Sequence, residues 1–222
     1  MNLVRNVFPF RFDPEMSRKE DEFYKQVFTE FIEVLIHQIV FIHKIYPDII
    51  FESRKKFNIP VKMSTHPWVN DYIESVMDTI RKQLTKDDPD FDSLEVIIAD
   101  QGDFVLRRYK LEFCHLLKRD RIFNPENFQQ RTELSLASML LRLHSMTSDD
   151  DEVRRNEERS NQWWVELGCE VRGAQRLMED RAWCLASGLG RDEDRDILPV
   201  MSFHAPFTCQ LYIEKSATTT RS

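Results

Sequence analysis

Cysteine is scarce in this sequence, and the few cysteines present have no recognisable spacing. The four are Cys114, Cys169, Cys184 and Cys209, and no two of them form a Cys-x-x-Cys pair. Disulfide scaffolds and zinc sites need paired or regularly spaced cysteines. We therefore expect free thiols in a reducing compartment, with neither a disulfide framework nor a bound metal.

Long apolar runs and a secretory leader are also missing. No window of about 18 residues is apolar throughout, which a membrane-spanning helix would need. The first residues do not combine a charged start with an apolar stretch and a small-residue cleavage site. We expect a soluble protein that does not enter a membrane.

Positive charge is too sparse for a surface that holds nucleic acid. The chain has 31 Lys and Arg against 38 Asp and Glu, which gives a net charge of −7. Binding to phosphate backbones needs a positive electrostatic footprint. The basic triplet Arg54-Lys55-Lys56 is typical of a solvated turn. We expect no direct, sequence-specific contact with nucleic acid.

The arrangements of side chains that enzymes use are absent as well. The six histidines lack the H-E-x-x-H spacing, and Cys114 and His115 are neighbours whose side chains point to opposite faces of a strand. Gly188-Leu189-Gly190 lacks the third glycine of a dinucleotide loop, and the acidic run 87–92 lacks the central glycine of a calcium loop. The sequence predicts a protein that is not an enzyme and that has no cofactor.

The sequence does contain enough apolar material for one folded domain, since 41% of its residues are hydrophobic and sixteen are phenylalanine. Residues 1–16 lack a period and are predicted to be an irregular arm. The capping box Ser17-Arg18-Lys19-Glu20 predicts the start of a long helix that Pro47 ends. The apolar positions of this helix repeat at three and four residues: Phe28, Phe31, Ile32, Leu35, Ile36, Ile39 and Val40.

The next hundred residues alternate between extended and helical patterns. Short extended pieces are predicted at 49–51 and 59–63 around a basic turn at 54–58. Thr65 is predicted to cap a second helix with Pro67 in its first turn. Segments 94–99 and 104–113 predict a hairpin at the centre of a sheet. A third helix is expected from about 125 to 146. The predicted core residues of the two helices are Val69, Ile73, Val76, Ile80, Leu84, Leu136, Met139, Leu140 and Leu143.

The last third of the chain changes character. Residues 148–159 are almost wholly polar or charged and predict a flexible connection. Beyond them, strand-like segments follow at 163–171, 183–185, 197–203 and 207–213. Pro199 and Pro206 should keep the last two segments away from the sheet centre. In Gln210-Leu211-Tyr212-Ile213, alternation predicts that Leu211 and Ile213 face the core and that Gln210 and Tyr212 face outward.

Several of these segments resemble the HORMA-domain family, and within it the accessory subunits of translesion DNA polymerase zeta. The resemblance is carried by runs in the first half and near the end of the chain: Phe28 to Val34, Ile45-Tyr46-Pro47 to Phe51, Arg54 to Val61, Met63-Ser64, His66-Pro67, Trp183 to Ala186, Leu198-Pro199 and Gln210 to Glu214. It implies an α+β HORMA fold, with three core helices on a mainly antiparallel sheet and a C-terminal safety belt. The domain would be 17–222, with a core at 17–147, a connection at 148–160 and the belt at 161–215.

The resemblance also implies a function and its residues. The family traps a proline-containing peptide of the polymerase's catalytic subunit by strand addition under the belt. The residues implied for that peptide are Tyr72, Trp183 and Leu185. The C-terminal domain of a scaffold translesion polymerase would contact Ile197, Gln210 and Tyr212, with Ile197 in place of the family's leucine. Other HORMA-binding peptides, a AAA+ remodelling ATPase and a location in the nucleus, with some protein in the cytoplasm, are implied too.

The oligomeric state and three alternative functions remain open at this point. The family's dimerising arginine aligns with Ala137, and Arg131 and Arg142 lie nearby, so homodimerisation is undecided. Within the fold, a spindle-checkpoint or cell-cycle protein would clamp its peptide with the same topology. From other classes, a small hydrolase or transferase would need a catalytic site, and a nucleic-acid-binding protein would need a basic surface.

Overall fold

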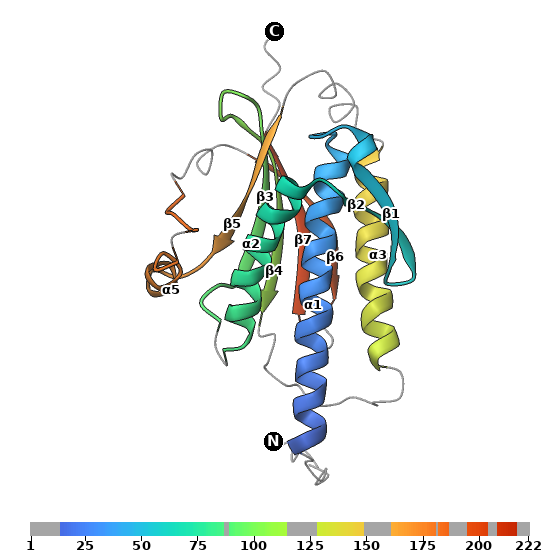
Figure 1. The fold of residues 1–222 in the computed structure, drawn as a ribbon, viewed down its shortest axis with the longest axis vertical. Coiled ribbons are helices and arrows are strands. Elements are labelled where there is room, and N and C mark those ends of the chain that lie inside the picture. Colours follow the sequence, from blue (N-terminus) through green and yellow to red (C-terminus); the bar gives the residue numbers. More distant parts are fainter. Residues whose placement is uncertain are drawn as a thin grey trace, which may run out of the picture.

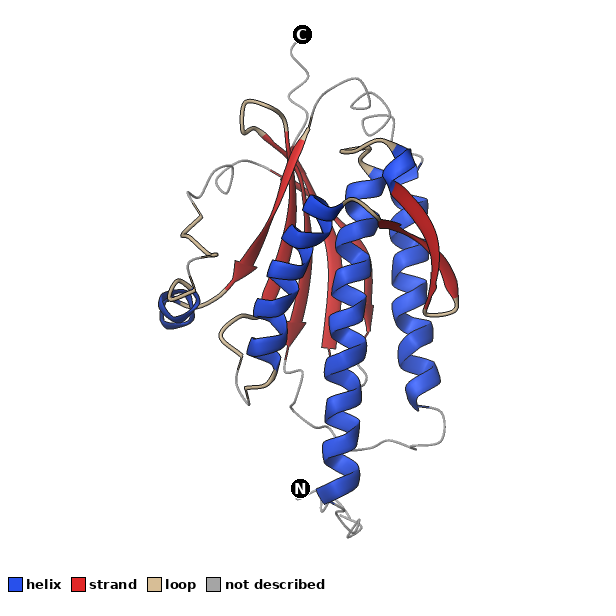
Figure 2. Ribbon diagram, viewed as in Figure 1, coloured by secondary structure: helices blue, strands red, loops and turns tan. Residues whose placement is uncertain are grey.

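A five-stranded antiparallel sheet forms the centre of the computed structural model, which describes residues 14–86, 89–114, 128–148, 161–180, 182–186, 195–203 and 208–216. The strand order is β5-β3-β4-β7-β6. Helices α1, α2 and α3 cover one face of this sheet (Figures 1 and 2). The elements of this layer are α1 (Pro14–Ile42), α2 (Pro67–Leu84), α3 (Phe128–Ser148), β3 (Ser93–Ala99), β4 (Val105–Cys114), β5 (Gln162–Gly168), β6 (Arg195–Phe203) and β7 (Thr208–Ser216). The predicted α+β class is confirmed.

Helix α1 begins earlier than its capping box predicts. It starts at Pro14, so Ser17 lies inside the helix and the predicted cap is wrong. Proline suits the first turn of a helix because its fixed φ is helical and its missing N–H would have no partner there. The seven predicted core residues of α1 are all buried, with Phe28 and Ile39 fully inaccessible. The predicted apolar stripe is therefore confirmed.

The end of α1 is set by backbone geometry and not by Pro47. The helix ends at Ile42, and Lys44 adopts a left-handed conformation with φ of 50°. The amide of Ile45 donates to the carbonyl of Val40, and the amide of Lys44 donates to that of Phe41. This pair of hydrogen bonds is the Schellman motif, which satisfies the last carbonyls of a helix.

A separate two-stranded hairpin follows, formed by β1 (Phe51–Lys56) and β2 (Ile59–Ser64). Its turn is Phe57-Asn58, with φ values of 48° and 60°, which fits a type I′ turn. The predicted basic turn at 54–58 is therefore wrong, because residues 54–56 belong to β1. Residues 48–50 form a short 3₁₀ helix, η1 (Asp48–Ile50), so the expected strand begins only at Phe51.

Helix α2 has the predicted apolar face but a different residue at its cap position. His66 occupies the cap position without a side-chain hydrogen bond, while the Thr65 hydroxyl donates to the carbonyl of Ile50. The predicted Thr65 cap is thus wrong, because that hydroxyl links the helix entry to η1. Pro67 starts the helix as predicted, and the five predicted core residues are buried.

The central hairpin and α3 agree with the sequence. Strands β3 and β4 pair in register from Ser93 opposite Glu112, and β4 lies at the middle of the five-stranded sheet. Leu136, Met139, Leu140 and Leu143 of α3 are buried. The predicted connection begins at 148, but Ser148 is the last residue of α3; residues 149–160 lie outside the described residues, as does His115.

The C-terminal third contains both agreements and corrections. The strand predicted at 163–171 ends earlier, as β5 at Gly168, and residues 171–177 form a short helix, α5 (Val171–Leu177), that was not predicted. Residues 183–185 are not a strand. β6, which contains Pro199, is an edge strand as expected. β7 is instead an interior strand paired with β4 and β6, because Pro206 precedes it and removes no amide from its ladder. None of the described helices is long and apolar enough to cross a bilayer.

Candidate functional site

β5 is an edge strand, and half of its backbone polar groups point away from the sheet. Among the described strands it pairs with β3 alone, and the amide of Val165 donates to the hydroxyl of Tyr72 on α2 at 3.1 Å. Backbone groups alternate in direction along a strand, so those of Trp163 and Leu167 point the same way as those of Val165. Such an edge is a template on which a further strand can pair.

Tyr72 belongs to α2, and its side chain extends from that helix to the edge of β5. Its side chain is 39% exposed, and its ring packs edge-to-face on that of Trp163, with 5.0 Å between centroids. Burial raises the pKa of Tyr72, and this effect outweighs the opposing hydrogen bond from Val165. The phenol therefore stays protonated at neutral pH, so it accepts from Val165 and keeps its own proton to donate.

Trp183 attaches the segment 182–186 to the same helix. Its indole Nε1 donates to the hydroxyl of Thr79 on α2 at 2.9 Å, and its ring packs against the core. Thr79 follows Tyr72 by seven residues, which places both on one face of α2, about 10 Å apart along the helix axis. Leu185 is 69% exposed. The structure thus brings Tyr72 and Trp183 to one helix face and leaves Leu185 open to solvent.

Helix α5, which follows β5 and precedes Trp183 in the sequence, contacts the loop that joins α2 to β3. The Asp90 carboxylate, which is 2% exposed, contacts Arg176 of α5 and Lys86, each at 2.6 Å. A Cβ atom at Gly173 would lie 2.3 Å from the carbonyl oxygen of Asp90, so glycine permits this approach. We call this contact between α5 and Asp90 the belt anchor, after the belt that the family resemblance implies for this part of the chain. Sequence reasoning missed it because nothing in the spacing of Asp90 and Arg176 indicates contact.

Burial of the Asp90 carboxylate acts to raise its pKa, but its partners reverse the effect. Hydrogen bonding and charge from Lys86, together with the charge of Arg176, hold the pKa of Asp90 below its ordinary value. The carboxylate is therefore ionised at neutral pH. A buried carboxylate keeps its charge only when it is paired in this way.

An open aromatic pocket of about 600 Å³ lies at the Trp163 end of β5. It is lined by residues of α2, β5 and the η1 region: Tyr46, Pro47, Ile50, His66, Trp68, Val69, Tyr72 and Trp163. Trp68 is 81% exposed. Sequence reasoning did not single out this pocket. The available signal was Trp68 itself, an aromatic residue that lies off the apolar stripe of its helix.

The three residues predicted for the second surface lie together on the sheet face opposite the helices. Directly opposite residues of paired strands share a face, and Ile197 pairs with Glu214 while Gln210 pairs with Ser202. Ile197 is 63% exposed, Gln210 is exposed and Tyr212 is half-buried. Leu211 and Ile213 are buried against the helices, so the predicted alternation is confirmed.

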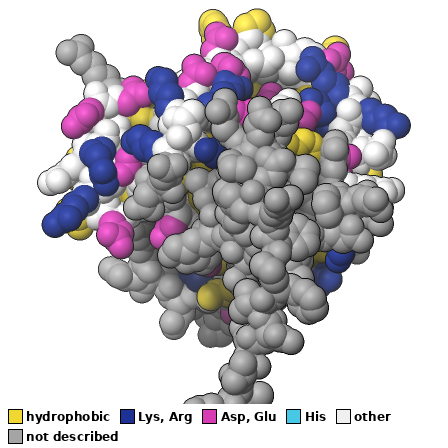
Figure 3. Space-filling model, turned by 90° about the horizontal axis from the view of Figure 1, so that it is seen from below, with side chains coloured by type: hydrophobic (Ala, Val, Ile, Leu, Met, Phe, Trp, Pro, Cys, Tyr) yellow, Lys and Arg dark blue, Asp and Glu magenta, His cyan; other side chains and the backbone are white. Residues whose placement is uncertain are grey.

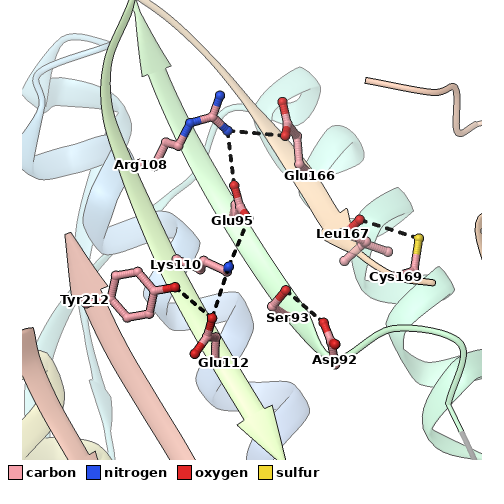
Figure 4. A network of polar contacts seen from close by, with 10 residues as sticks. All are labelled: Asp92, Ser93, Glu95, Arg108, Lys110, Glu112, Glu166, Leu167, Cys169 and Tyr212. Carbon is pink, nitrogen blue, oxygen red and sulfur yellow. Dashed lines mark hydrogen bonds and ion pairs between the residues drawn. The ribbon is translucent and has the colours of Figure 1, made fainter. Parts of the chain in front are cut away.

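Tyr212 differs from the prediction in one respect, because its hydroxyl is already engaged. It donates to Glu112 at 2.7 Å, and Glu112 also contacts the ammonium group of Lys110 at 3.0 Å (Figure 4). Burial, followed by the hydrogen bond to Glu112, raises the pKa of Tyr212 to about 12. The same network continues through Glu95 and Arg108 to Glu166 of β5.

The described residues show no constellation for metal binding, and the basic triplet is largely neutralised. No group of three or more His, Cys, Asp or Glu residues within the described ranges could hold a metal ion. Arg54 contacts Glu52 at 2.6 Å, and Lys56 pairs with Glu30. On the face shown in Figure 3, the coloured acidic and basic side chains are interspersed. This pattern differs from the single-sign surface of a phosphate-binding protein.

The residues considered for self-association have different environments. Ala137 is buried within the helical layer, whereas Arg131 and Arg142 are exposed on α3. Ala137 itself therefore cannot contribute a surface contact. The alternatives at Arg131 and Arg142 remain.

Comparison with curated proteins found related sequences in animals and plants, although no protein-family model matches the chain. A rat protein named mitotic spindle assembly checkpoint protein MAD2B is 36% identical over 119 residues, which is 53% of this chain and 54% of the rat protein. The Drosophila melanogaster DNA polymerase zeta subunit 2 is 28% identical over 91 residues, which is 41% of this chain and 45% of that protein. The chain spans about half the length of the curated relatives that it matches.

Comparison with solved structures supports the fold. A chain in the crystal structure of the mitotic checkpoint complex aligns with a TM-score of 0.69 and 14% identity, covering 87% of this chain and 98% of that chain. HTP-1 of C. elegans bound to HTP-3 motif-1 aligns with a TM-score of 0.57 and 8% identity, covering 90% and 91%. At such identities the likeness concerns the fold alone.

Proposed function

We propose that this chain, which has the HORMA fold and resembles the accessory subunit of DNA polymerase zeta, is a non-catalytic adaptor that clamps a partner's peptide. The observation that carries the proposal is the edge of β5. Outward backbone groups at Val165 lie beside Tyr72, and the following segment returns to Trp183 on the same face of α2. A peptide strand paired with this edge would lie between β5 and the returning segment.

The chemistry of strand addition fits these residues. Main-chain hydrogen bonds to the edge of β5 would supply affinity, and side-chain contacts would supply selection. Tyr72 and Trp183 offer large apolar faces with one polar tip each, which suits a proline-containing peptide. Leu185 is exposed and follows Trp183 by two residues, so it would contact the peptide from the belt side.

The partner is proposed to be the catalytic subunit of DNA polymerase zeta, by analogy with the named relatives. A scaffold translesion polymerase would bind the separate face of Ile197, Gln210 and Tyr212 through its C-terminal domain. Other HORMA-binding peptides could compete for the belt, and a AAA+ ATPase would remodel it. For this role in DNA damage tolerance we propose a location in the nucleus, with some protein in the cytoplasm.

A spindle-checkpoint or cell-cycle peptide clamp is the second candidate. It is favoured by the fold shared with a chain of the mitotic checkpoint complex and by the name that the rat relative carries. The two candidates differ in the peptide that is captured. A side-by-side binding measurement with peptides of the polymerase subunit and of checkpoint proteins would separate them.

The adaptor proposal is tested by changing the two aromatic residues separately. Tyr72→Ala and Trp183→Ala should each weaken capture of the proline-containing peptide of the catalytic subunit, measured by calorimetry. Central aromatic anchors commonly cost at least ~2 kcal/mol, roughly thirtyfold in affinity. Leu134→Ala is a matched control, because Leu134 is an exposed apolar residue on α3. Unchanged affinity in both aromatic variants would reject this site.

The adaptor proposal also concerns what the protein does not do. We expect no hydrolase, transferase or redox turnover, and only weak, salt-sensitive binding to DNA without sequence preference. Turnover abolished by changing a single polar residue, or tight DNA binding by the isolated chain at physiological salt, would contradict it.

A further inference from the structure

The aromatic pocket beside β5 exposes more apolar surface than the fold requires. Trp68, which lines the pocket, is 81% exposed. Contiguous exposed apolar patches on a folded domain mark interaction sites. Tryptophan and tyrosine are also the residues most enriched among the dominant contacts of interfaces.

The pocket is continuous with the edge of β5. Trp163 is the second residue of β5, and its backbone points outward in the same direction as that of Val165. Tyr72 contributes to both features, because its ring lines the pocket and its hydroxyl accepts from Val165. A strand added to this edge therefore reaches the pocket at its Trp163 end.

The walls of the pocket are held in place by contacts of their own. The indole Nε1 of Trp163 donates to the hydroxyl of Tyr46 at 3.2 Å. The ring of His66 packs edge-to-face with that of Trp68, with 5.8 Å between centroids. Aromatic walls fixed in this way lose little conformational freedom when a ligand binds.

The lining also indicates the chemistry of the occupant. None of the residues that line the pocket is Asp, Glu, Lys or Arg. A carboxylate placed there would lose hydration and meet the negative faces of the aromatic rings without an ionic partner, whereas an apolar side chain would gain contact area. The residue types therefore favour an apolar side chain and select against negative charge.

We propose that this pocket binds a large apolar side chain, aromatic or branched aliphatic, of the same peptide that pairs with β5. This inference rests on the proposed function and adds an anchor outside the peptide's proline-contacting part. The anchor would lie where the added strand passes Trp163, and Trp68 would cover it from α2. Peptides with an acidic or small residue at that position would be captured less tightly.

The test combines a protein variant with peptide variants. The probe is the proline-containing peptide of the polymerase zeta catalytic subunit, with each apolar residue outside the prolines changed to alanine in turn. Trp68→Ala should weaken binding of the intact probe at least tenfold, and one alanine peptide should show a similar loss. The two losses should not add when the variants are combined, because both remove the same contact.

Ile49→Ala is the matched control, since Ile49 is exposed beside the pocket but does not line it. Wild-type affinity in that variant supports the assignment to the pocket. If Trp68→Ala binds the intact probe like the wild type, or if its loss adds fully to that of every alanine peptide, the pocket inference is wrong while Tyr72 and Trp183 can still define a clamp. If the wild-type protein binds no probe, the proposed function and this inference both fail.

Discussion

Different interactions hold the core together and hold the described residues of the segment 169–186 on it. The core is held by apolar burial, with Phe28 of α1, Leu94 of β3 and Leu211 of β7 fully inaccessible. In the segment 169–186, Val171 and Leu185 are 77% and 69% exposed, and Leu177 is the buried apolar side chain of α5. Its attachment depends on the belt anchor, on the hydrogen bond from Trp183 to Thr79 and on the packing of Leu177 and the Trp183 ring against the core.

This difference suggests how a clamp can open without unfolding. Segments with few buried apolar contacts open at a lower free-energy cost than core strands. The segment 169–186 could thus detach while β6 and β7 stay paired with each other and with β4. The proposed belt then consists of a weakly attached part before residue 187 and a firmly attached hairpin at its end.

The largest expected effect is a loss of folding stability when Leu211 of β7 is changed, and it tests whether β7 belongs to the core. Leu211→Ala should lower the free energy of unfolding by ~2–5 kcal/mol, because it leaves a cavity at a fully buried position. Chemical denaturation measures the change. Gln210→Ala, at the exposed neighbouring position, should stay within about 0.5 kcal/mol of the wild type. A wild-type stability for Leu211→Ala would place the terminal hairpin with the weakly attached segment.

Acid should weaken the core before it weakens the belt anchor. His37 is buried and accepts a hydrogen bond from the amide of Ser64; burial, with a smaller effect of Arg54, lowers its pKa from 6.5 to about 4. The unfolded chain therefore takes up a proton first as the pH falls. Stability should fall between pH 6.5 and 4, by up to about 3 kcal/mol.

Denaturation curves across that pH range measure the effect. His37→Asn offers an acceptor oxygen in place of Nδ1 and has no titrating ring, so its stability should vary less over the same range. An equal pH dependence in the variant would show that His37 is not responsible. The anchor carboxylate of Asp90, whose pKa is lowered, should lose its contribution only at more acidic pH, as the pH falls through its folded pKa.

The belt anchor should affect peptide release more than folding. Asp90→Asn removes the charge that pairs with Arg176 and Lys86, so release of the trapped peptide should be several-fold faster. Unfolding should change by about 1 kcal/mol or less, because both cationic side chains are largely exposed and stay hydrated without the carboxylate. Gly173→Ala should act in the same direction, because its Cβ would collide with the Asp90 carbonyl. Dissociation of a labelled peptide measures both.

Asp180→Asn is the control for the belt anchor, since its contact with Lys82 is long, at 4.0 Å, and exposed. Release at the wild-type rate from both Asp90→Asn and Gly173→Ala would show that the anchor does not hold the belt. A large loss of folding stability would instead assign Asp90 to the core.

The smallest effect on stability is expected on the outer sheet face. The double change Gln210→Ala with Tyr212→Ala should abolish scaffold binding while leaving the trapped peptide and the melting curve nearly unaltered. Tyr212→Phe should have a milder effect, because it removes the hydrogen bond to Glu112 and keeps the ring. If the double variant releases the peptide, or if it is destabilised as much as Leu211→Ala, the hypothesis of two separate binding surfaces is wrong.

Patterns within one element were readable from the sequence. The three- and four-residue repeat of α1, the apolar face of α2 and the alternation at Leu211 and Ile213 each predicted the buried side chains. The ends of helices and strands were harder to predict from the sequence, because they depend on the backbone dihedral angles of single residues. Lys44 ends α1 through a left-handed conformation, and a Phe57-Asn58 turn replaced the predicted basic turn.

The sequence by itself determined the apolar faces, the central hairpin and, through local resemblance, which residues to consider for partners. The tertiary structure decided which of those residues meet. The contacts of Tyr72 with Val165, Trp183 with Thr79 and Asp90 with Arg176 join residues 86 to 104 positions apart. Local periodicity reports which face of an element is buried, but it contains no information on which distant residue lies opposite, because that depends on how the strands are ordered and how the chain returns.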